Sequence, residues 1–188
     1  MNKVWLAIIN YMFNLKKQSA FSLLETVVVL FIVSVGLLGV LTLVVNSQKT
    51  RTLNKNALVA QYLAREGIEL IRNVRDTNWL ESTSSAPIAW NRYIEGSPSG
   101  INYRVSYDNF IPEPITDISE AKLQFSTGTD SNFYTHATGS PDSMFSRMVT
   151  ITAADSAAPS STVSVLVQWL DQGQTYSYTL DTLLYDWR

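Results

Sequence analysis

The sequence predicts an α+β fold in which one long N-terminal α-helix precedes a C-terminal antiparallel β-sheet. Three observations support this prediction. The run 27–45 contains no charged residue and no proline. After this run, small or apolar residues recur every three or four positions as far as Val74, which is the period of a helix face. From residue 101 onward the period changes to two, which is typical of half-buried strands.

The run 27–45 is long enough to cross a membrane as a helix. At about 1.5 Å per residue it measures roughly 28 Å, and the hydrocarbon layer of a bilayer is about 30 Å thick. A single strand is excluded in lipid because its edges would leave backbone groups without partners. Basic residues lie on both sides of the run, so the positive-inside rule does not orient it. They are Lys3, Lys16 and Lys17 before the run, and Lys49, Arg51 and Lys55 after it.

The segment after the span predicts a second, amphipathic half of the same helix. We interpret its apolar stripe as the face that packs on the core of a globular domain. Gly67 lies within this segment and lowers the helix propensity by about 1 kcal/mol relative to alanine. A single helix from residue 22 to about residue 76 is therefore predicted. The stripe consists of Leu53, Ala57, Ala60, Ala64, Ile68, Ile71 and Val74.

Alternating sequences predict the strands of the sheet. The segments "INYRVSY" (101–107), "SRMVTIT" (146–152), "STVSVLVQWL" (161–170) and "TYSYTLDTLL" (175–184) alternate in this way, and a short strand is expected at 123–125. The stretch 171–174, "DQGQ", supplies turn residues, which predicts a C-terminal hairpin. Because no helical segment separates these strands, we expect an antiparallel sheet that packs on the helix.

The segment before the span does not have the order of an ordinary secretory signal. Such a signal ends in a small-x-small cleavage site after its apolar core. The residues that follow Val45, "NSQKTRTLNKN", contain no such site, and the small residue Ala20 precedes the apolar run instead. Cleavage after Ala20 would leave the apolar helix on the mature chain.

Residues 16–20, "KKQSA", followed by residues 21–25, "FSLLE", resemble the class III leader of type IV prepilins and type II secretion pseudopilins. The resemblance covers residues 16 to about 75, and beyond them only the general layout. It implies a pilin-like fold, a basic leader end at Lys16 and Lys17, and cleavage between Ala20 and Phe21. The same membrane peptidase would methylate the new amine of Phe21. The family usually has glycine before the cleavage site, and this chain has Ala20.

Glu25 is the acidic residue at the border of the apolar run, and it has two interpretations. With Ser22 it matches a capping box, in which each side chain bonds to the other residue's amide. A carboxylate there also suits the positive end of the helix dipole, by about 0.3–1 kcal/mol. The resemblance implies an assembly role, in which Glu25 pairs with the Phe21 amine of a neighbouring subunit. Both groups gain from such a pair at an apolar border.

The predicted organisation has four parts. Residues 1–20 form the leader peptide, and residues 21–46 form the hydrophobic helix that crosses the membrane or lies in a filament core. Residues 47–80 form the amphipathic half of the helix, and residues 81–188 form the sheet-bearing head with polar loops.

The composition excludes several classes of site. The chain has no cysteine, so disulfides, thiolate nucleophiles and cysteine-based zinc sites are absent. The single histidine, His136, lacks the Ser, Cys or acidic arrangement of a catalytic residue, and Asp130 and Asp142 lie in no recognised calcium-loop motif. We therefore expect no enzymatic activity, no cofactor and no metal.

These observations lead us to expect a structural subunit of a type IV pilus-like filament or secretion pseudopilus, with a minor subunit favoured. The expected partners are a prepilin peptidase/N-methyltransferase, other pilin subunits and the inner or cytoplasmic membrane. We expect a single-pass membrane protein before assembly, and a cell-surface or periplasmic filament afterwards. The alternatives are a DNA-uptake pilin, a membrane-anchored surface protein that does not polymerise, and a membrane-anchored enzyme. Removing the three leader lysines from the 14 basic residues leaves 11 against 16 acidic residues. This acidic balance argues against general nucleic-acid binding.

Overall fold

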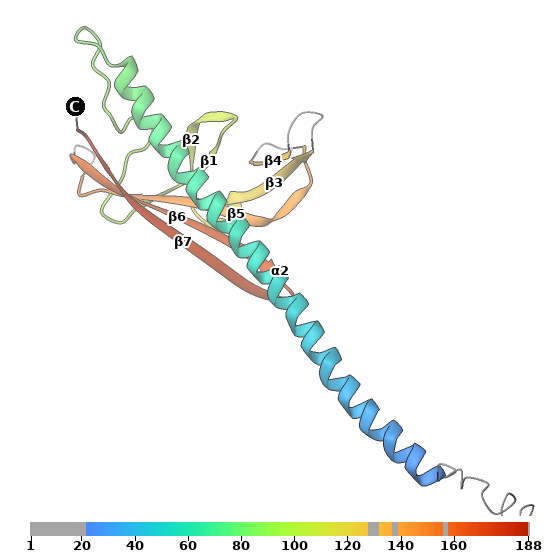
Figure 1. Cartoon of the computed structure of the whole chain (residues 1–188). Helices are drawn as coiled ribbons and strands as arrows, with labels where there is room; N and C mark the ends of the chain where they lie inside the picture. Colours follow the sequence, from blue (N-terminus) through green and yellow to red (C-terminus); the bar gives the residue numbers. More distant parts are fainter. Residues whose placement is uncertain (1–21, 128–131, 137–138, 156–157, 188) are drawn as a thin grey trace, which may run out of the picture. The chain divides into compact units, whose positions relative to one another are not determined.

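The computed structural model describes residues 22–127, 132–136, 139–155 and 158–187. Within them lie one long helix, α2 (Leu23–Glu81), one 3-10 helix, η1 (Ile118–Ala121), and seven strands (Figure 1). The contacts divide the chain between Lys49 and Thr50 into two units, and each is described by itself below. The strands are β1 (Ile101–Ser106), β2 (Asn109–Ile115), β3 (Lys122–Thr127), β4 (Asn132–Thr135), β5 (Asp142–Thr152), β6 (Ser160–Asp171) and β7 (Gln174–Tyr185).

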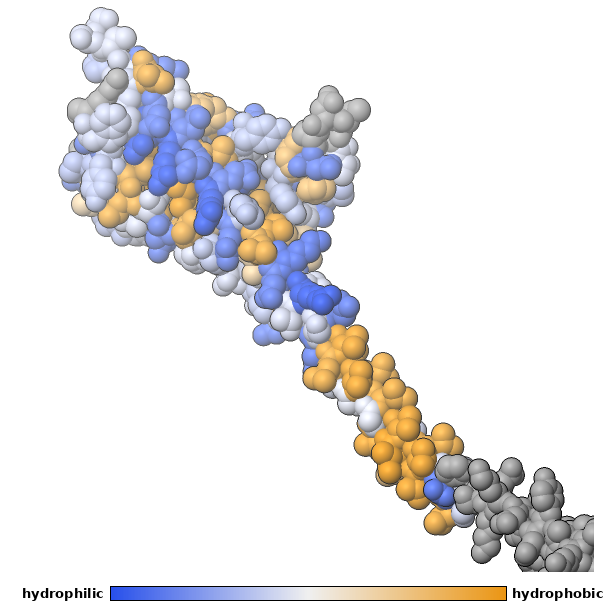
Figure 2. All heavy atoms as spheres, in the orientation of Figure 1, coloured by the Kyte–Doolittle hydropathy of each residue, from blue (hydrophilic) through white to orange (hydrophobic). Residues whose placement is uncertain are grey.

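The first unit, as far as it is described, consists of the apolar half of α2. All of its described side chains are exposed, and hydrophobic residues cover this part of the helix in Figure 2. The hydroxyl of Ser34 donates to the Leu30 carbonyl at 2.6 Å, and that of Thr42 donates to the Leu38 carbonyl at 2.9 Å. These bonds satisfy the two polar side chains of the apolar run. Among the described residues, α2 alone is long and apolar enough to cross a membrane by length and composition.

The second half of α2 packs on the sheet, as the apolar stripe predicted. Five residues of the stripe, from Ala60 to Val74, are buried, and Leu53 and Ala57 at its start are half-buried. The helix ends at Glu81, next to the predicted end of the amphipathic segment 47–80. Near this end, the buried amide of Asn78 donates to the Trp90 carbonyl at 3.0 Å and to the Arg92 carbonyl at 2.8 Å. These two bonds attach the last turn of the helix to the following loop.

The strands form one antiparallel sheet, which confirms the predicted fold class. The central strand is β5, which pairs with β6 along most of its length. On its other side β5 pairs with β1 through residues 149–151 and with β3 through residues 142–146. The outer strands are β2 next to β1, β4 next to β3, and β7 next to β6. The described sheet therefore has three edges.

Two of the edge strands were not predicted. The sequence of β2 is "NFIPEPI", and its two prolines argue against a strand in the interior of a sheet. They are compatible with an edge strand, where an N–H group can face away from the ladder. The strand β4 has only four residues, which is too short for an alternating pattern to stand out.

The core lies between α2 and the inner faces of β1, β5 and β6. The expected inward residues of β6, from Val163 to Trp169, are all buried. Val149 and Ile151 of β5 and Tyr103 and Val105 of β1 are buried against them. The interleaved residues of β6 are half-buried or exposed, as a period of two requires.

Candidate functional site

Glu25 lies in the first turn of α2, where main-chain bonds hold the helix start. The Glu25 amide donates to the Ser22 carbonyl oxygen at 2.9 Å, and the Thr26 amide donates to the same oxygen at 3.1 Å. The Thr26 hydroxyl donates to the Leu23 carbonyl at 2.8 Å. In the described part of the chain, no side-chain bond joins Ser22 and Glu25. The capping-box interpretation is therefore wrong for this structure, and the Glu25 carboxylate remains exposed.

The surroundings of Glu25 are apolar. Leu23 and Leu24 are 81% and 74% exposed, and Val27 and Val28 beyond Glu25 are 56% and 47% exposed. Between Ser22 and Gln48, Glu25 is the one charged residue in the sequence. A carboxylate on such a surface gains from a cationic partner when water is removed from it. The arrangement is therefore suited to a helix–helix contact in lipid or in a filament core.

The other residues predicted for processing lie outside the described residues. They are Lys16 and Lys17 of the leader, and Ala20 and Phe21 at the cleavage junction. Cleavage at this junction and methylation of Phe21 remain predictions.

In the second unit, a fully buried arginine joins the helix to the sheet. The side chain of Arg147, on β5, has no exposed surface. Its Nη1 donates to the Leu63 carbonyl of α2 at 3.2 Å, and its Nη2 donates to the Val105 carbonyl of β1 at 2.7 Å. Nη1 also pairs with Glu66 Oε1 at 3.2 Å. Burial lowers the pKa of Arg147, and the Glu66 carboxylate acts in the opposite direction.

Close packing surrounds this arginine. A Cβ atom at Gly67 would lie 3.0 Å from Val165 Cγ1 and 3.3 Å from Arg147 Cδ. Gly67, which the sequence suggested only as a weak point of the helix, thus allows α2 to approach β5 and β6 closely. The burial of Arg147 was missed by sequence reasoning. The sequence did contain one indication of it. Arg147 lies two and four residues before Val149 and Ile151, so in a strand it shares their inward face.

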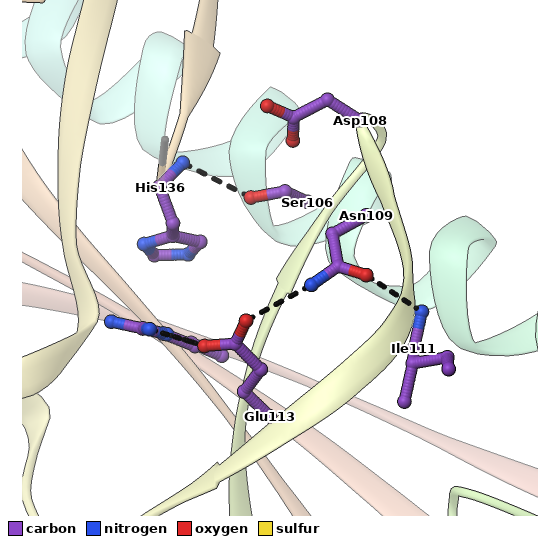
Figure 3. Close-up of a pocket in the computed structure, with 7 residues that line it drawn as sticks. Ser106, Asp108, Asn109, Ile111, Glu113 and His136 are labelled. Atoms are coloured by element: carbon purple, nitrogen blue, oxygen red, sulfur yellow. Dashed lines mark hydrogen bonds and ion pairs between the residues drawn. The ribbon is translucent and has the colours of Figure 1, made fainter. Parts of the chain in front are cut away.

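A pocket of about 180 Å³ lies near the β1–β2 hairpin and contains His136 (Figure 3). The His136 amide donates to Ser106 Oγ at 3.0 Å, and its Nδ1 lies 3.1 Å from the Lys122 carbonyl oxygen. Because a carbonyl oxygen only accepts, Nδ1 carries the proton. Burial and, next, the positive charge of Arg147 lower the pKa of His136 to about 4. The ring is therefore neutral near pH 7.

The pocket is lined by the charged residues Arg104, Asp108 and Glu113, and Asp108 accepts from Thr135 Oγ1 at 2.8 Å. Arg104 and Glu113 form an ion pair across β1 and β2, and Asn109 Nδ2 donates to Glu113 Oε1 at 2.9 Å. These contacts hold the hairpin together (Figure 3). The described residues contain no group of three or more His, Asp or Glu side chains arranged to hold a metal ion. Asp142 pairs with Lys122 at 3.3 Å, and Asp130 lies outside the described residues.

The N-terminal segment matches a known family. The model of the prokaryotic N-terminal methylation motif matches residues 15–41. The chain carries the prepilin-type methylation motif. The matched prepilin-type segment includes the Ala20–Phe21 junction, Glu25 and most of the apolar run. The comparisons with curated proteins and with solved structures gave no match.

A prepilin-type motif implies a prepilin peptidase and other pilin subunits as partners. The apolar half of α2 implies association with a membrane and is consistent with a single-pass anchor. Together with the long helix and the antiparallel sheet, the motif supports a processed, type IV pilin-like or pseudopilin subunit.

Proposed function

We propose that the chain is a structural subunit, of the minor type, in a type IV pilus-like filament or secretion pseudopilus. The observation that carries this proposal is the position of Glu25. It is an exposed carboxylate in the first turn of an otherwise uncharged helix, within the segment that matches the methylation motif. The helix dipole by itself favours a carboxylate there by only about 0.3–1 kcal/mol, and a partner charge on a neighbouring subunit adds to this gain at an apolar border.

The proposed mechanism starts with removal of the leader. Cleavage between Ala20 and Phe21 creates a free α-amine, whose ordinary pKa of about 7.7–8.0 keeps it largely protonated near neutral pH. The peptidase then methylates this amine of Phe21. Methylation leaves the amine able to carry a positive charge, because an alkylated amine still binds a proton.

Assembly uses the two charges at the helix start. Before assembly, the subunit is a single-pass protein in the inner or cytoplasmic membrane, with its apolar helix in lipid. On joining the filament, its Glu25 carboxylate pairs with the Phe21 amine of a neighbouring subunit. In the pair, each charge compensates the other within an apolar environment, while the apolar side chains of the helices pack on one another. The filament then lies at the cell surface or in the periplasm.

The charge pattern of the second unit, residues 50–188, supports a structural role over nucleic-acid binding. Several of its described basic side chains pair with acidic ones, which leaves less positive charge for phosphate groups. These pairs are Arg72–Glu69, Arg75–Asp76, Arg104–Glu113, Lys122–Asp142 and Arg147–Glu66.

Mass spectrometry of the protein isolated from its native membranes tests the processing steps. We expect a mature N-terminal peptide that begins at Phe21 and carries one methyl group on its amine. An Ala20→Leu variant, which enlarges the residue before the cleavage site, should accumulate with the leader attached. A mature chain that begins at Met1, or that is cut near residue 48, would contradict the proposal.

A further inference from the structure

The three edges of the sheet differ in their protection against pairing with another strand. The edge strand β2 carries Pro112 and Pro114, which have no N–H group to donate. The edge strand β4 has four residues. In contrast, β7 has 12 residues and contains neither proline nor lysine. Among the described strands, β7 pairs with β6 alone (Figure 1). It is therefore the edge that is open to strand addition.

The register of the β6–β7 hairpin determines which backbone groups face outward. Asp171 pairs with Gln174 across Gln172 and Gly173, whose φ angles are 50° and 79°. Positive φ at both central residues corresponds to a two-residue type I′ turn, in which the flanking pair exchanges both hydrogen bonds. Hydrogen-bonded and non-hydrogen-bonded pairs alternate from there. The outward N–H and C=O groups therefore belong to Thr175, Ser177, Thr179, Asp181, Leu183 and Tyr185.

The inner face of β7 is suited to apolar side chains of an added strand. Tyr176, Tyr178 and Leu180 pack against the core but are only half-buried. Trp169 of β6 stacks on Tyr176, with the ring centroids 5.7 Å apart. A further strand beside β7 would place its inward side chains next to this row and remove more of the apolar surface from water.

The sequence that contains β6 and β7 is rich in acidic residues. From Met148 to Trp187 the sequence contains four aspartates and no lysine or arginine. Asp181 lies on the exposed outer face of β7 itself. Arg72 reaches Thr182 Oγ1 at 3.3 Å from the inner side, but it is paired with Glu69. A basic segment is attracted to this edge, whereas a second copy of β7 would bring further acidic charge. The four aspartates are Asp155, Asp171, Asp181 and Asp186.

We propose that the β7 edge binds an extended segment of a different protein chain by strand addition. The segment has apolar side chains on the face that continues the inner face of β7, and basic side chains on the opposite face. Main-chain hydrogen bonds to the outward groups of β7 supply affinity, and the alternation of side chains supplies specificity. This proposal goes beyond the filament subunit and does not depend on cleavage at Ala20.

A synthetic peptide tests the proposal on the full chain in detergent micelles. The probe is a fluorescent 12-residue peptide of three Val-Lys-Val-Thr repeats, and its binding is followed by anisotropy. We expect saturable binding that is about tenfold tighter than that of the same peptide with glutamate in place of lysine. A peptide that is N-methylated at alternate residues lacks donors for the ladder and should not bind. Hydrogen exchange should show new protection at the outward amides of β7.

Three variants locate the site. Thr179→Pro removes a central outward N–H, which an edge strand tolerates, and should weaken binding at least about tenfold. Asp181→Lys keeps the backbone amide and reverses the charge of the side chain. It should therefore weaken binding of the lysine peptide and strengthen binding of the glutamate peptide. Glu81→Lys makes the same charge change at the exposed end of α2 and should leave binding unchanged.

Several results would overturn the proposal. One is equal binding of the N-methylated peptide, since this would show adsorption without strand pairing. Another is binding that Asp181→Lys does not change. A dimer of the chain that Thr179→Pro abolishes would assign this edge to a second copy instead of a different protein. None of these results depends on leader processing. The strand-addition proposal can therefore fail while the filament proposal still holds, and the reverse is also true.

Discussion

Arg147 and Glu66 form an ion pair across the interface of helix and sheet, with Nη1 and Oε1 3.2 Å apart. The arginine is fully buried, whereas the Glu66 side chain is 38% exposed. The two residues therefore differ in how strongly they are removed from water. Arg147 also satisfies two backbone carbonyls, of Leu63 and Val105, so its side chain connects α2, β1 and β5.

Replacing Arg147 by alanine should lower the free energy of unfolding by about 3–5 kcal/mol. The change leaves two buried carbonyl groups without a donor and opens a cavity beneath α2. Glu66→Ala leaves the fully buried Arg147 guanidinium without its carboxylate partner, so it should also be destabilising, by about 3 kcal/mol. Urea unfolding in detergent, followed by tryptophan fluorescence, measures both effects. Arg65→Ala, at an exposed position of the helix, is the control and should change stability by less than about 0.5 kcal/mol. Equal stability of Arg147→Ala and the parent chain would contradict this account.

A large side chain at Gly67 should separate α2 from the sheet. A Cβ atom added there would lie 3.0 Å from Val165 Cγ1, so Gly67→Leu overpacks the interface and should cost about 1–3 kcal/mol or more. Arg65→Leu introduces the same side chain at an exposed position of the helix and serves as the matched control. The thermal midpoints of the two variants, measured by circular dichroism, give the comparison. If Gly67→Leu is as stable as Arg65→Leu, the close approach of helix and sheet is not needed for stability.

The stability of the head should depend on pH through His136. Its pKa is about 4 in the folded chain and about 6.5 in the unfolded chain, so the unfolded state binds more protons between these values. Stability therefore rises with pH through this range and is fully present above about pH 6.5. The effect should reach about 2 kcal/mol between pH 4.5 and pH 7.5.

The comparison with His136→Gln isolates this effect. Acidic residues also titrate near pH 4 in both proteins, so only the difference between the two pH profiles reports on the histidine. We expect a flatter profile for the variant when urea midpoints are measured at a series of pH values. Parallel profiles would show that His136 is protonated equally in the folded and unfolded states.

The C-terminal residues should stabilise the head without a disulfide. Trp79 Nε1 donates to Asp186 Oδ1 at 3.3 Å, and the Trp79 and Trp187 rings meet edge to face with centroids 4.5 Å apart. The Asp186 amide also donates to the Pro159 carbonyl at 2.8 Å. Deleting residues 186–188 should lower the free energy of unfolding by about 1–3 kcal/mol. An Arg188 deletion is the control, and equal midpoints for the two truncations would refute a stabilising role for the tail.

Glu25→Gln should block assembly while leaving the helix intact. Glutamine has the same shape and keeps the helix start, but it carries no charge to pair with the Phe21 amine. We expect the variant to be cleaved and methylated normally and to be absent from sheared filaments, or from cross-linked subunit ladders in the case of a pseudopilus. Ser34→Ala, at another polar position of the apolar run, should assemble like the parent chain. Normal incorporation of Glu25→Gln would remove the main support for the assembly mechanism.

The prediction of the fold succeeded where the pattern was periodic and continuous. The apolar run 27–45 and the stripe from Leu53 to Val74 are long repeats, and one helix is the only element that accommodates both. In the same way, the alternation in β6 defined its inward face before any partner strand was known. The methylation motif also lies in a contiguous segment, so its match needs no tertiary information.

Prediction failed where a residue's role depends on distant segments. The prolines of β2 are unfavourable in a sheet interior, and only the sheet order shows that this strand is an edge. Gly67 weakens an isolated helix, yet in the folded chain it allows close contact with Val165. The neutral state of His136 arises from burial and from the nearby Arg147, which neighbouring sequence cannot reveal.

The sequence by itself determined the apolar helix, the processing motif, the lone carboxylate and the inward faces of the long strands. These features depend on local composition and on periods of 3.6 and 2, which any segment carries within itself. Only the tertiary structure decided that Arg147 is buried and that β7 is the unprotected edge. Burial of an arginine is favourable only when the oxygens of Leu63, Glu66 and Val105 lie within bonding distance of it. Which strand is an edge is defined only when all strands of the sheet have paired.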